Sequence, residues 1–206
     1  MPGNYEDLSD LQIDVLKEIG NIGAGNAATT LSSMLSKKVD MTVPHVRIVD
    51  IQEISHALGG PENLVVGILF TISNDIEGMM MFILEQKFAH LIINELMGKD
   101  LNDFAELEEM DISALKEIGN IMAGSYVNAI SGLTNLNINI SVPNIALDMA
   151  GAILSVPAIM FGEVGDKVLF IEEEFIGEGE NVNSYLMLIP EMESLHKILK
   201  VLGVEI

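Results

Sequence analysis

The chain has 206 residues and 49% of them are apolar, so it is long enough to fold around a sizeable hydrophobic core. Its 31 acidic side chains outnumber its 10 basic ones, and the formal charge of −21 argues against binding to nucleic acid or to an anionic membrane surface. The absence of cysteine excludes disulfides, thiolate nucleophiles and Cys-bound metal centres, and it is consistent with a cytoplasmic protein. The N-terminus lacks the pattern of a signal peptide and no apolar run reaches about 18 residues, so we expect no membrane insertion.

The predicted elements follow one another in the same order twice. The first half is expected to contain a helix at 8–37, a short strand at 39–43 that ends at Pro44, a short helix at 51–58, hairpin strands at 64–72 and 77–84, and a helix at 86–97 that ends at Gly98. The second half is expected to contain a helix at 107–134, a strand at 138–142, a helix at 147–161, strands at 167–173 and 183–189, and a helix at 191–202. Each half therefore has the order α-β-α-β-β-α, which predicts the α+β class with a mixed rather than a parallel sheet.

An internal repeat underlies this order. Residues 16–22 are identical to residues 115–121, and without gaps the match gives 12 identities in the 31 positions from 14 to 44. Two copies are too few for a solenoid, so a duplicated half-domain with a pseudo-two-fold axis fits better. We therefore expect one domain over 1–206, made of halves 1–98 and 107–206 and joined by a polar linker at 99–106.

The repeated helix carries a narrow polar stripe. At 3.6 residues per turn, the side chains of Asp14, Glu18, Asn21 and Gly25 fall within about 60° of one another. These four residues form the first stripe. Apolar residues occupy the opposite, core-facing side. The second stripe holds their equivalents Ser113, Glu117, Asn120 and Gly124.

The alternative to a functional stripe is an ordinary solvated helix face. Two features favour function, because Asn and Gly are both poor residues for a helix interior and yet both occur there twice. Gly on the stripe permits close approach by another molecule. Gly20 and Gly119 flank the core side, where we expect them to let helices cross closely.

Other patterns carry less chemistry. The glycines at 20, 23 and 25 have the wrong order for a dinucleotide-binding loop, and the four histidines lack zinc-site spacing, so no metal site is predicted. Residues 172–174 are all Glu and are expected to form a solvated strand edge. With no positioned Cys, Ser–His pair or His, covalent catalysis lacks support. A carboxylate and an amide can instead orient a water or clamp a cation, which is sufficient for phosphoryl transfer to water.

At these residues the sequence resembles the CheC/CheX/FliY family of chemotaxis phosphatases. The signature of that family, D/S-x3-E-x2-N-x22-P, occurs twice here, with Pro44 closing the first copy and Pro143 the second. Two intact copies resemble the CheC type rather than CheX, and the chain ends at Ile206 without the extra switch-binding domain of FliY. The resemblance implies a shared six-stranded sheet with two long helices on one face.

The resemblance also implies an activity and partners. Asn21 and Asn120 would orient the water that attacks the phospho-aspartate of the response regulator CheY, and Glu18 and Glu117 would pair with a Lys of CheY. The chain would bind no cofactor itself, since Mg²⁺ would be held by CheY. The receptor deamidase CheD would bind at the short second-half helix, with Asp148 as the chosen contact residue.

Two other functions remain open from the sequence. The chain could be a weakly catalytic or non-catalytic adaptor that binds CheD and response regulators, because a complete signature indicates capacity and not rate. A structural component of the flagellar switch is disfavoured by the missing domain. By itself the chain is expected to be a monomer.

Overall fold

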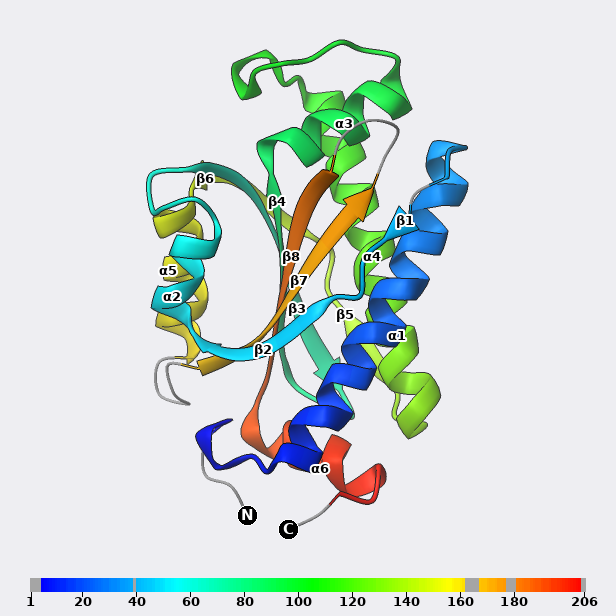
Figure 1. Ribbon diagram of the computed structural model, residues 1–206, viewed down its shortest axis with the longest axis vertical. Coiled ribbons are helices and arrows are strands. Elements are labelled where there is room, and N and C mark those ends of the chain that lie inside the picture. The colour runs from blue at the N-terminus through cyan, green and yellow to red at the C-terminus, as the bar shows by residue number, and fades with distance from the viewer. Residues whose placement is uncertain (1–4, 39, 162–166, 177–180, 205–206) are drawn as a thin grey trace.

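The fold is seen in a computed structural model that describes residues 5–38, 40–161, 167–176 and 181–204 (Figure 1). The first half contains η1 (Tyr5–Asp7), α1 (Asp10–Leu35), β1 (Asp40–Met41), β2 (His45–Asp50), α2 (Ile51–Ala57), β3 (Leu64–Asn74), β4 (Gly78–Glu85) and α3 (Gln86–Met97). The second half contains η2 (Phe104–Glu106), α4 (Glu109–Thr134), β5 (Ile138–Ile140), β6 (Asn144–Met149), α5 (Ala150–Phe161), β7 (Lys167–Ile176), β8 (Asn181–Pro190) and α6 (Met192–Val201). The predicted class and the order of elements are confirmed, with one extra strand in each half.

The strands form one sheet with the order β1-β7-β8-β4-β3-β5, in which β2 also pairs with β7 and β6 also pairs with β3. All pairings among the described strands are antiparallel, so the predicted mixed sheet is wrong. Adjacent strands of a hairpin are antiparallel, which accounts for β3–β4 and β7–β8. Every other pair joins strands from different halves, and these pairs are antiparallel as well. Each half thus supplies the edge strand that completes the hairpin of the other half.

Each edge of the sheet is a strand broken in two. β1 and β2 are separated by residues 42–44, and β5 and β6 by residues 141–143, so both breaks end in the signature proline. Proline has no backbone N–H to donate to a strand ladder, which suits a break in an edge strand. Counted across its width, the sheet has six positions, as the family resemblance implies. Val39, expected to open the first strand, lies outside the described residues.

The start of the short second-half helix is corrected by three residues. Residues 147–149 belong to β6, where Asp148 is opposite Val65 of β3, and α5 begins only at Ala150. The apolar run around Leu147 is compatible with either helix or strand. These residues form a strand because they pair with β3. Since β3 lies in the other half of the chain, no local sequence pattern indicated the strand.

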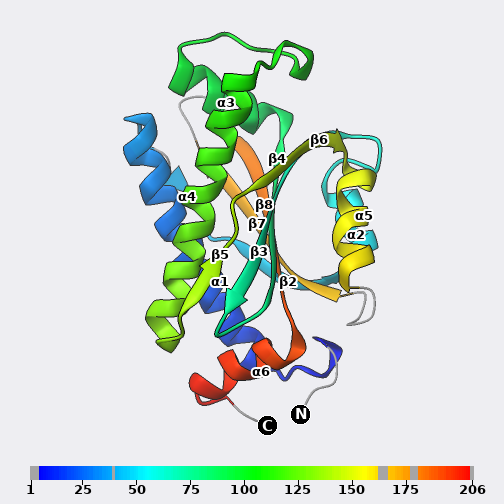
Figure 2. The same ribbon diagram turned by 180° about the vertical axis from the view of Figure 1, so that it is seen from behind.

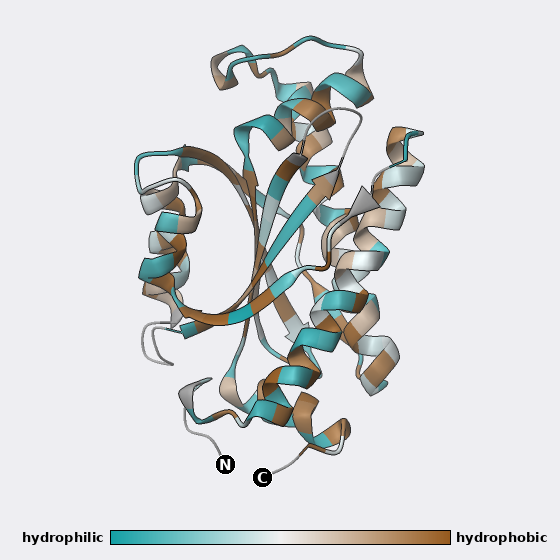
Figure 3. Ribbon diagram, viewed as in Figure 1, coloured by the Kyte–Doolittle hydropathy of each residue, from teal (hydrophilic) through white to brown (hydrophobic). Residues whose placement is uncertain are grey.

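The helices cover the sheet in two layers. Figures 1 and 2 show α1 and α4 side by side on one face, α2 and α5 on the other, and α3 and α6 near opposite ends of α1 and α4. The larger core lies under α1, α3, α4 and α6, and a smaller core lies under α2 and α5. Hydrophobic and hydrophilic segments alternate along the lower part of α1, as a helix with one buried face requires (Figure 3). Among the described helices, none has the length and apolar character needed to cross a membrane.

The two long helices begin and end in the same way. Each has 26 residues and opens with a capping box, formed by Ser9 with Gln12 in α1 and by Glu108 with Asp111 in α4. Each closes on a left-handed residue, Ser36 with φ 51° or Asn135 with φ 56°. Residues at equivalent places in the two halves, such as Ser36 and Asn135, are called twins below. The matching ends set both stripes at the same height on their helices.

Candidate functional site

The two stripes face away from the sheet, on helices that run in opposite directions (Figures 1 and 2). Glu18, Glu117 and Asn120 are exposed, while Asn21 is half-buried. The apolar side of each helix is turned inward, with Leu16, Ile19, Leu115 and Ile118 fully or almost fully buried. The predicted outward position of the stripes is therefore confirmed. Each stripe keeps its own Glu and Asn together on one helix.

The two stripe glutamates have no partner within the part of the chain that the structure describes. Neither Glu18 nor Glu117 makes a hydrogen bond or an ion pair there. Asp14, in contrast, accepts from Lys17 Nζ at 3.0 Å, and the hydroxyl of Ser113 donates to the backbone oxygen of Glu109 at 3.1 Å. The exposed Glu side chains are thus available to a cation on another molecule, whereas the first residue of each stripe serves its own helix.

Asn21 differs from its twin in one respect. Its side-chain oxygen Oδ1 is buried and has no hydrogen-bond partner among the described residues, while Asn120 is exposed. A buried polar atom without a partner costs about 1–3 kcal/mol. The first site is therefore held in an arrangement that costs free energy.

Glycines on the helices divide into two kinds. A Cβ atom built on Gly25 or Gly124 would meet nothing within 4 Å, as expected for the open side of a stripe. A Cβ on Gly20 would lie 2.8 Å from Val46, and one on Gly119 would lie 2.9 Å from Ile68. Gly20 and Gly119 therefore let the helices approach the sheet, and the expectation that they serve helix crossing is wrong.

The close approach of the helices is made by Gly23. A Cβ built there would overlap the Tyr126 ring of α4. The twins of Gly23 and Tyr126 are Met122 and Ala27, which are also fully buried. The glycine triplet at 20, 23 and 25 thus has three separate uses, and none of them is a phosphate loop.

The signature prolines lie beside the helices at the edges of the sheet. Pro44 is two residues before Val46, which packs against the Gly20 backbone. The valines that precede the two prolines are both strongly exposed, Val43 at 76% and Val142 at 82%. The described structure shows no contact between a proline and the Glu or Asn of its own stripe.

One acidic residue has an environment that the sequence did not predict. Glu173 is fully buried, whereas Glu172 is half-buried and lies 3.4 Å from Arg47, so the expected solvated edge is wrong for the middle residue. The hydroxyl of Tyr126 donates to Glu173 Oε1, and that of Ser184 donates to Oε2 at 2.7 Å. Burial raises the pKa of Glu173 to about 7, against these two hydrogen bonds, which lower it. The signal in the sequence that could have indicated this environment is that Tyr126 stands where the first copy of the repeat has Ala27.

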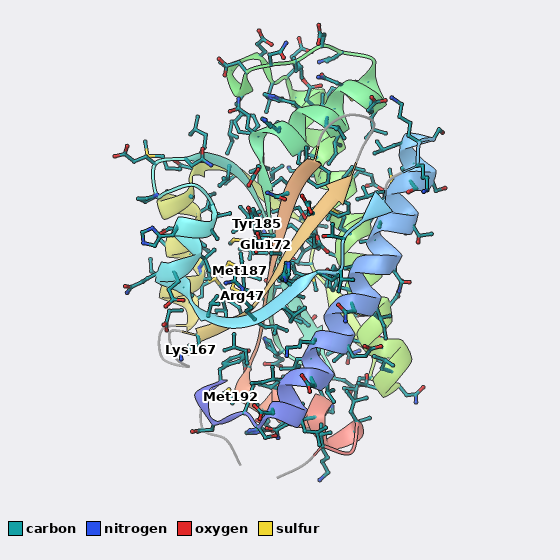
Figure 4. All side chains as sticks on the ribbon, viewed as in Figure 1. Arg47, Lys167, Glu172, Tyr185, Met187 and Met192 are labelled. Carbon is teal, nitrogen blue, oxygen red and sulfur yellow. The ribbon has the colours of Figure 1, made fainter. Side chains whose placement is uncertain are left out.

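A pocket of about 410 Å³ lies on the opposite face of the sheet, between α2, β2 and β7. Its polar lining is Arg47, Glu53 and His56. Figure 4 shows Arg47 and Glu172 close together where β2 passes in front of β7. Since adjacent strand residues point to opposite faces, Arg47 points away from α1 while Val46 points toward it. The pocket is therefore separated from both stripes by the sheet.

No group of three or more His, Asp or Glu side chains among the described residues has the arrangement of a metal site. What each stripe offers is one carboxylate and one amide on a rigid helix, open to a large partner. Such a pair can hydrogen-bond a water molecule and bind a cationic side chain, but it lacks a nucleophile of its own.

Comparison with known proteins finds one matching family and several similar relatives. The model of the CheC-like family matches residues 11–48 and 110–147, the two segments that contain the stripes and the prolines. The CheY-P phosphatase CheC of Bacillus subtilis is 33% identical over 204 residues, covering 97% of both chains. The flagellar motor switch phosphatase FliY of the same organism is 34% identical over 69% of this chain and 37% of its own length.

The fold is shared with a solved relative. The crystal structure of Thermotoga maritima FliY superposes with a TM-score of 0.75 at 28% identity, covering 96% of this chain and 98% of that one. The doubled signature, the interlocked halves and the near full-length match together place this chain in the CheC-like family.

Proposed function

We propose that this chain hydrolyses the aspartyl phosphate of phosphorylated CheY, in the termination of a chemotaxis signal. The observation that carries the proposal is the pair of identical Glu–Asn sets on the outward faces of α1 and α4, with both carboxylates unpartnered among the described residues. The names of the two Bacillus subtilis relatives support the substrate.

Each site would act by positioning. Asn21 or Asn120 would hydrogen-bond a water molecule in line with the bond between phosphorus and the aspartyl oxygen. The water oxygen forms a new bond to phosphorus while the bond between phosphorus and the aspartyl oxygen breaks. The aspartate leaves as a carboxylate, and inorganic phosphate keeps the water oxygen and its two protons. Catalysis of this kind depends on orientation and charge neutralisation rather than on a protein nucleophile.

The glutamates would dock the substrate. Glu18 or Glu117 would form an ion pair with a Lys of CheY, drawing that cation away from the phosphoryl group. The net charge of −21 supports attraction of a basic surface over long range. The Mg²⁺ of the reaction would be bound by CheY, because each stripe offers too few oxygen ligands to enclose it.

The experiment measures the lifetime of the aspartyl phosphate on CheY with the wild-type chain and with Asn21→Ala, Asn120→Ala and the double variant. We expect each single variant to keep part of the activity. The double variant should lose at least about 30-fold, since a preorganised polar group contributes about 2–4 kcal/mol to the barrier. Asn26→Ala is the matched control, because Asn26 is an exposed Asn of α1 outside the stripe.

A second function, the adaptor, is favoured by one observation. Helix α5 exposes Val156, Ile159 and Met160 at 38%, 82% and 55%, an unusual apolar surface on the helix that directly follows the exposed Met149 of β6. Its twin helix α2 exposes Gln52, Glu53 and His56 instead. We propose that CheD binds this apolar surface of α5, with Asp148 at its edge in β6. If the wild-type chain binds CheD but leaves the phosphate lifetime unchanged, the adaptor replaces the phosphatase.

A further inference from the structure

The buried cluster around Glu173 joins three elements. Glu173 lies on β7, Ser184 lies directly opposite it on β8, and Tyr126 reaches it from α4. All three residues are fully buried. Removing a carboxylate from water costs several kcal/mol unless hydrogen bonds compensate for it, so this cluster is expensive to maintain.

The other half of the chain shows that the fold does not need the cluster. His45 is opposite Glu172 and its twin Asn144 is opposite Leu69, so the twin of Glu173 is Phe70. Phe70 is opposite Met80, which is therefore the twin of Ser184. With Ala27 as the twin of Tyr126, all three equivalent positions are apolar. The polar cluster is therefore an addition to one half.

The cluster reaches the back of the first stripe. The Tyr126 ring lies against the backbone of Gly23, which is two residues from both Asn21 and Gly25. On the outer side of the same turn, Asn21 Oδ1 is buried without a described partner. Contacts on the inner side of this turn fix the rotation of α1 and therefore the position of Asn21. The Tyr126 ring makes such a contact.

We infer that Tyr126, anchored by Glu173 and Ser184, is a positioning residue for the first site, Glu18 and Asn21, and that the second site has no such brace. This inference rests on the proposed function, in which Glu18 and Asn21 form a phosphatase site. The hydroxyl anchor fixes the ring, and the ring fixes the part of α1 that carries Asn21. At the twin position Ala27 has neither a ring nor a hydroxyl, and Tyr126, although it belongs to α4, lies six residues along that helix from Asn120.

The test uses proteins with one working site. Tyr126→Phe is introduced into Asn120→Ala, which keeps only the first site, and into Asn21→Ala, which keeps only the second. We expect kcat for CheY dephosphorylation to fall about five- to tenfold in the first protein and less than about twofold in the second, since a misplacement of 1 Å costs up to about 100-fold. A general loss of stability would lower both, because the two sites share one fold.

Tyr185→Phe is the matched control. Tyr185 is a buried tyrosine of β8, and its hydroxyl donates to Glu85 Oε1 at 2.7 Å on the face away from α1. We expect this variant to change the two single-site proteins equally. Equal losses from Tyr126→Phe in both proteins would overturn the positioning role.

A second measurement does not depend on activity. Hydrogen exchange of the amides at 18–25 and 117–124 is compared between the wild type and Tyr126→Phe. We expect exchange to accelerate at least about threefold in the first segment and not in the second. Equal protection in both segments overturns the inference. If neither single-site protein acts on phosphorylated CheY, the proposed function fails, and the exchange comparison still decides whether Tyr126 braces α1.

Discussion

The stripe glycines permit a test that separates docking from folding. The variant is Gly25→Leu with Gly124→Leu, which places a bulky side chain on each stripe. At both positions a Cβ would meet nothing within 4 Å, and neither glycine has a positive φ. The structure therefore predicts that folding tolerates the change and that a docked partner does not.

The expected change in stability follows from helix propensity. Gly is about 1 kcal/mol worse than Ala in a helix interior and Leu is close to Ala, so two substitutions should stabilise the fold by about 1.5 kcal/mol. For a chain of 206 residues that corresponds to a rise in melting temperature of roughly 3–6 °C. The affinity for phosphorylated CheY should fall at least about tenfold, because the protruding side chains prevent contact with Glu18 and Asn21.

The assay measures thermal unfolding by circular dichroism and CheY binding by fluorescence on the same protein. Gly132→Leu is the matched control, since Gly132 is an exposed helical glycine of α4 that also has open space and lies off the stripe. It should raise the melting temperature without weakening CheY binding. Gly20→Ala is the opposite control, because its Cβ would lie 2.8 Å from Val46 and should destabilise by about 1–3 kcal/mol.

A large fall in the melting temperature of the double Leu variant would refute this reasoning. It would mean that Gly25 and Gly124 serve internal packing, leaving only the Glu and Asn residues as site candidates. An unchanged affinity for CheY at a raised melting temperature would place the docking surface elsewhere.

Three further predictions concern the buried acid, the metal and the CheD surface. Burial raises the pKa of Glu173 from 4.5 to about 7, so the folded state binds more protons than the unfolded state and the stability contributed by this group is lost as pH rises through 7. The free energy of urea unfolding of the wild type should therefore fall by about 2 kcal/mol between pH 5.5 and 8, and Glu173→Gln should abolish this fall. Parallel pH profiles for the two proteins would contradict the assignment. Calorimetry should detect no micromolar Mg²⁺ binding to the chain alone, and a site removed by Glu18→Ala would disprove this. Ile159→Glu should weaken CheD binding at least about tenfold while Gln52→Glu on the twin helix leaves it unaltered; equal affinities would exclude the α5 surface.

Local signals predicted most of the fold. The helical period predicted α1 and α4 within two residues at each end, and Gly98, with φ 64°, ends α3 as expected. The hairpin β3–β4 was also found, because its two strands and its turn lie within one stretch of sequence, and β7 and β8 were both expected as strands. These features depend on neighbours along the chain.

Features that depend on residues far away in the sequence could not be predicted from local patterns. β2 and β6 are strands because they pair with β7 and β3, and neither partner is nearby in the chain. Strand alternation accounts for the burial of Glu173 between its half-buried neighbours Glu172 and Glu174. The hydrogen-bond partners that stabilise the buried carboxyl group come from α4 and β8. Likewise the use of Gly23 depends on the size of Tyr126 on another helix. In each case the missing information was a contact between residues far apart in the sequence.

The duplication itself gives the strongest argument about the site. Identity between twins at Leu16, Ile19 and Gly20 is explained by packing, since these positions are buried against a shared core. Packing does not explain the identity of Glu18 with Glu117, because both side chains are exposed and neither makes a hydrogen bond or ion pair with another described residue. The buried crossing of the helices, in contrast, has diverged to Gly23 with Tyr126 on one side and Ala27 with Met122 on the other. A fold that tolerates divergence where the helices meet, yet repeats the same acid and amide on its outer surface, keeps those residues for a molecule that binds from outside.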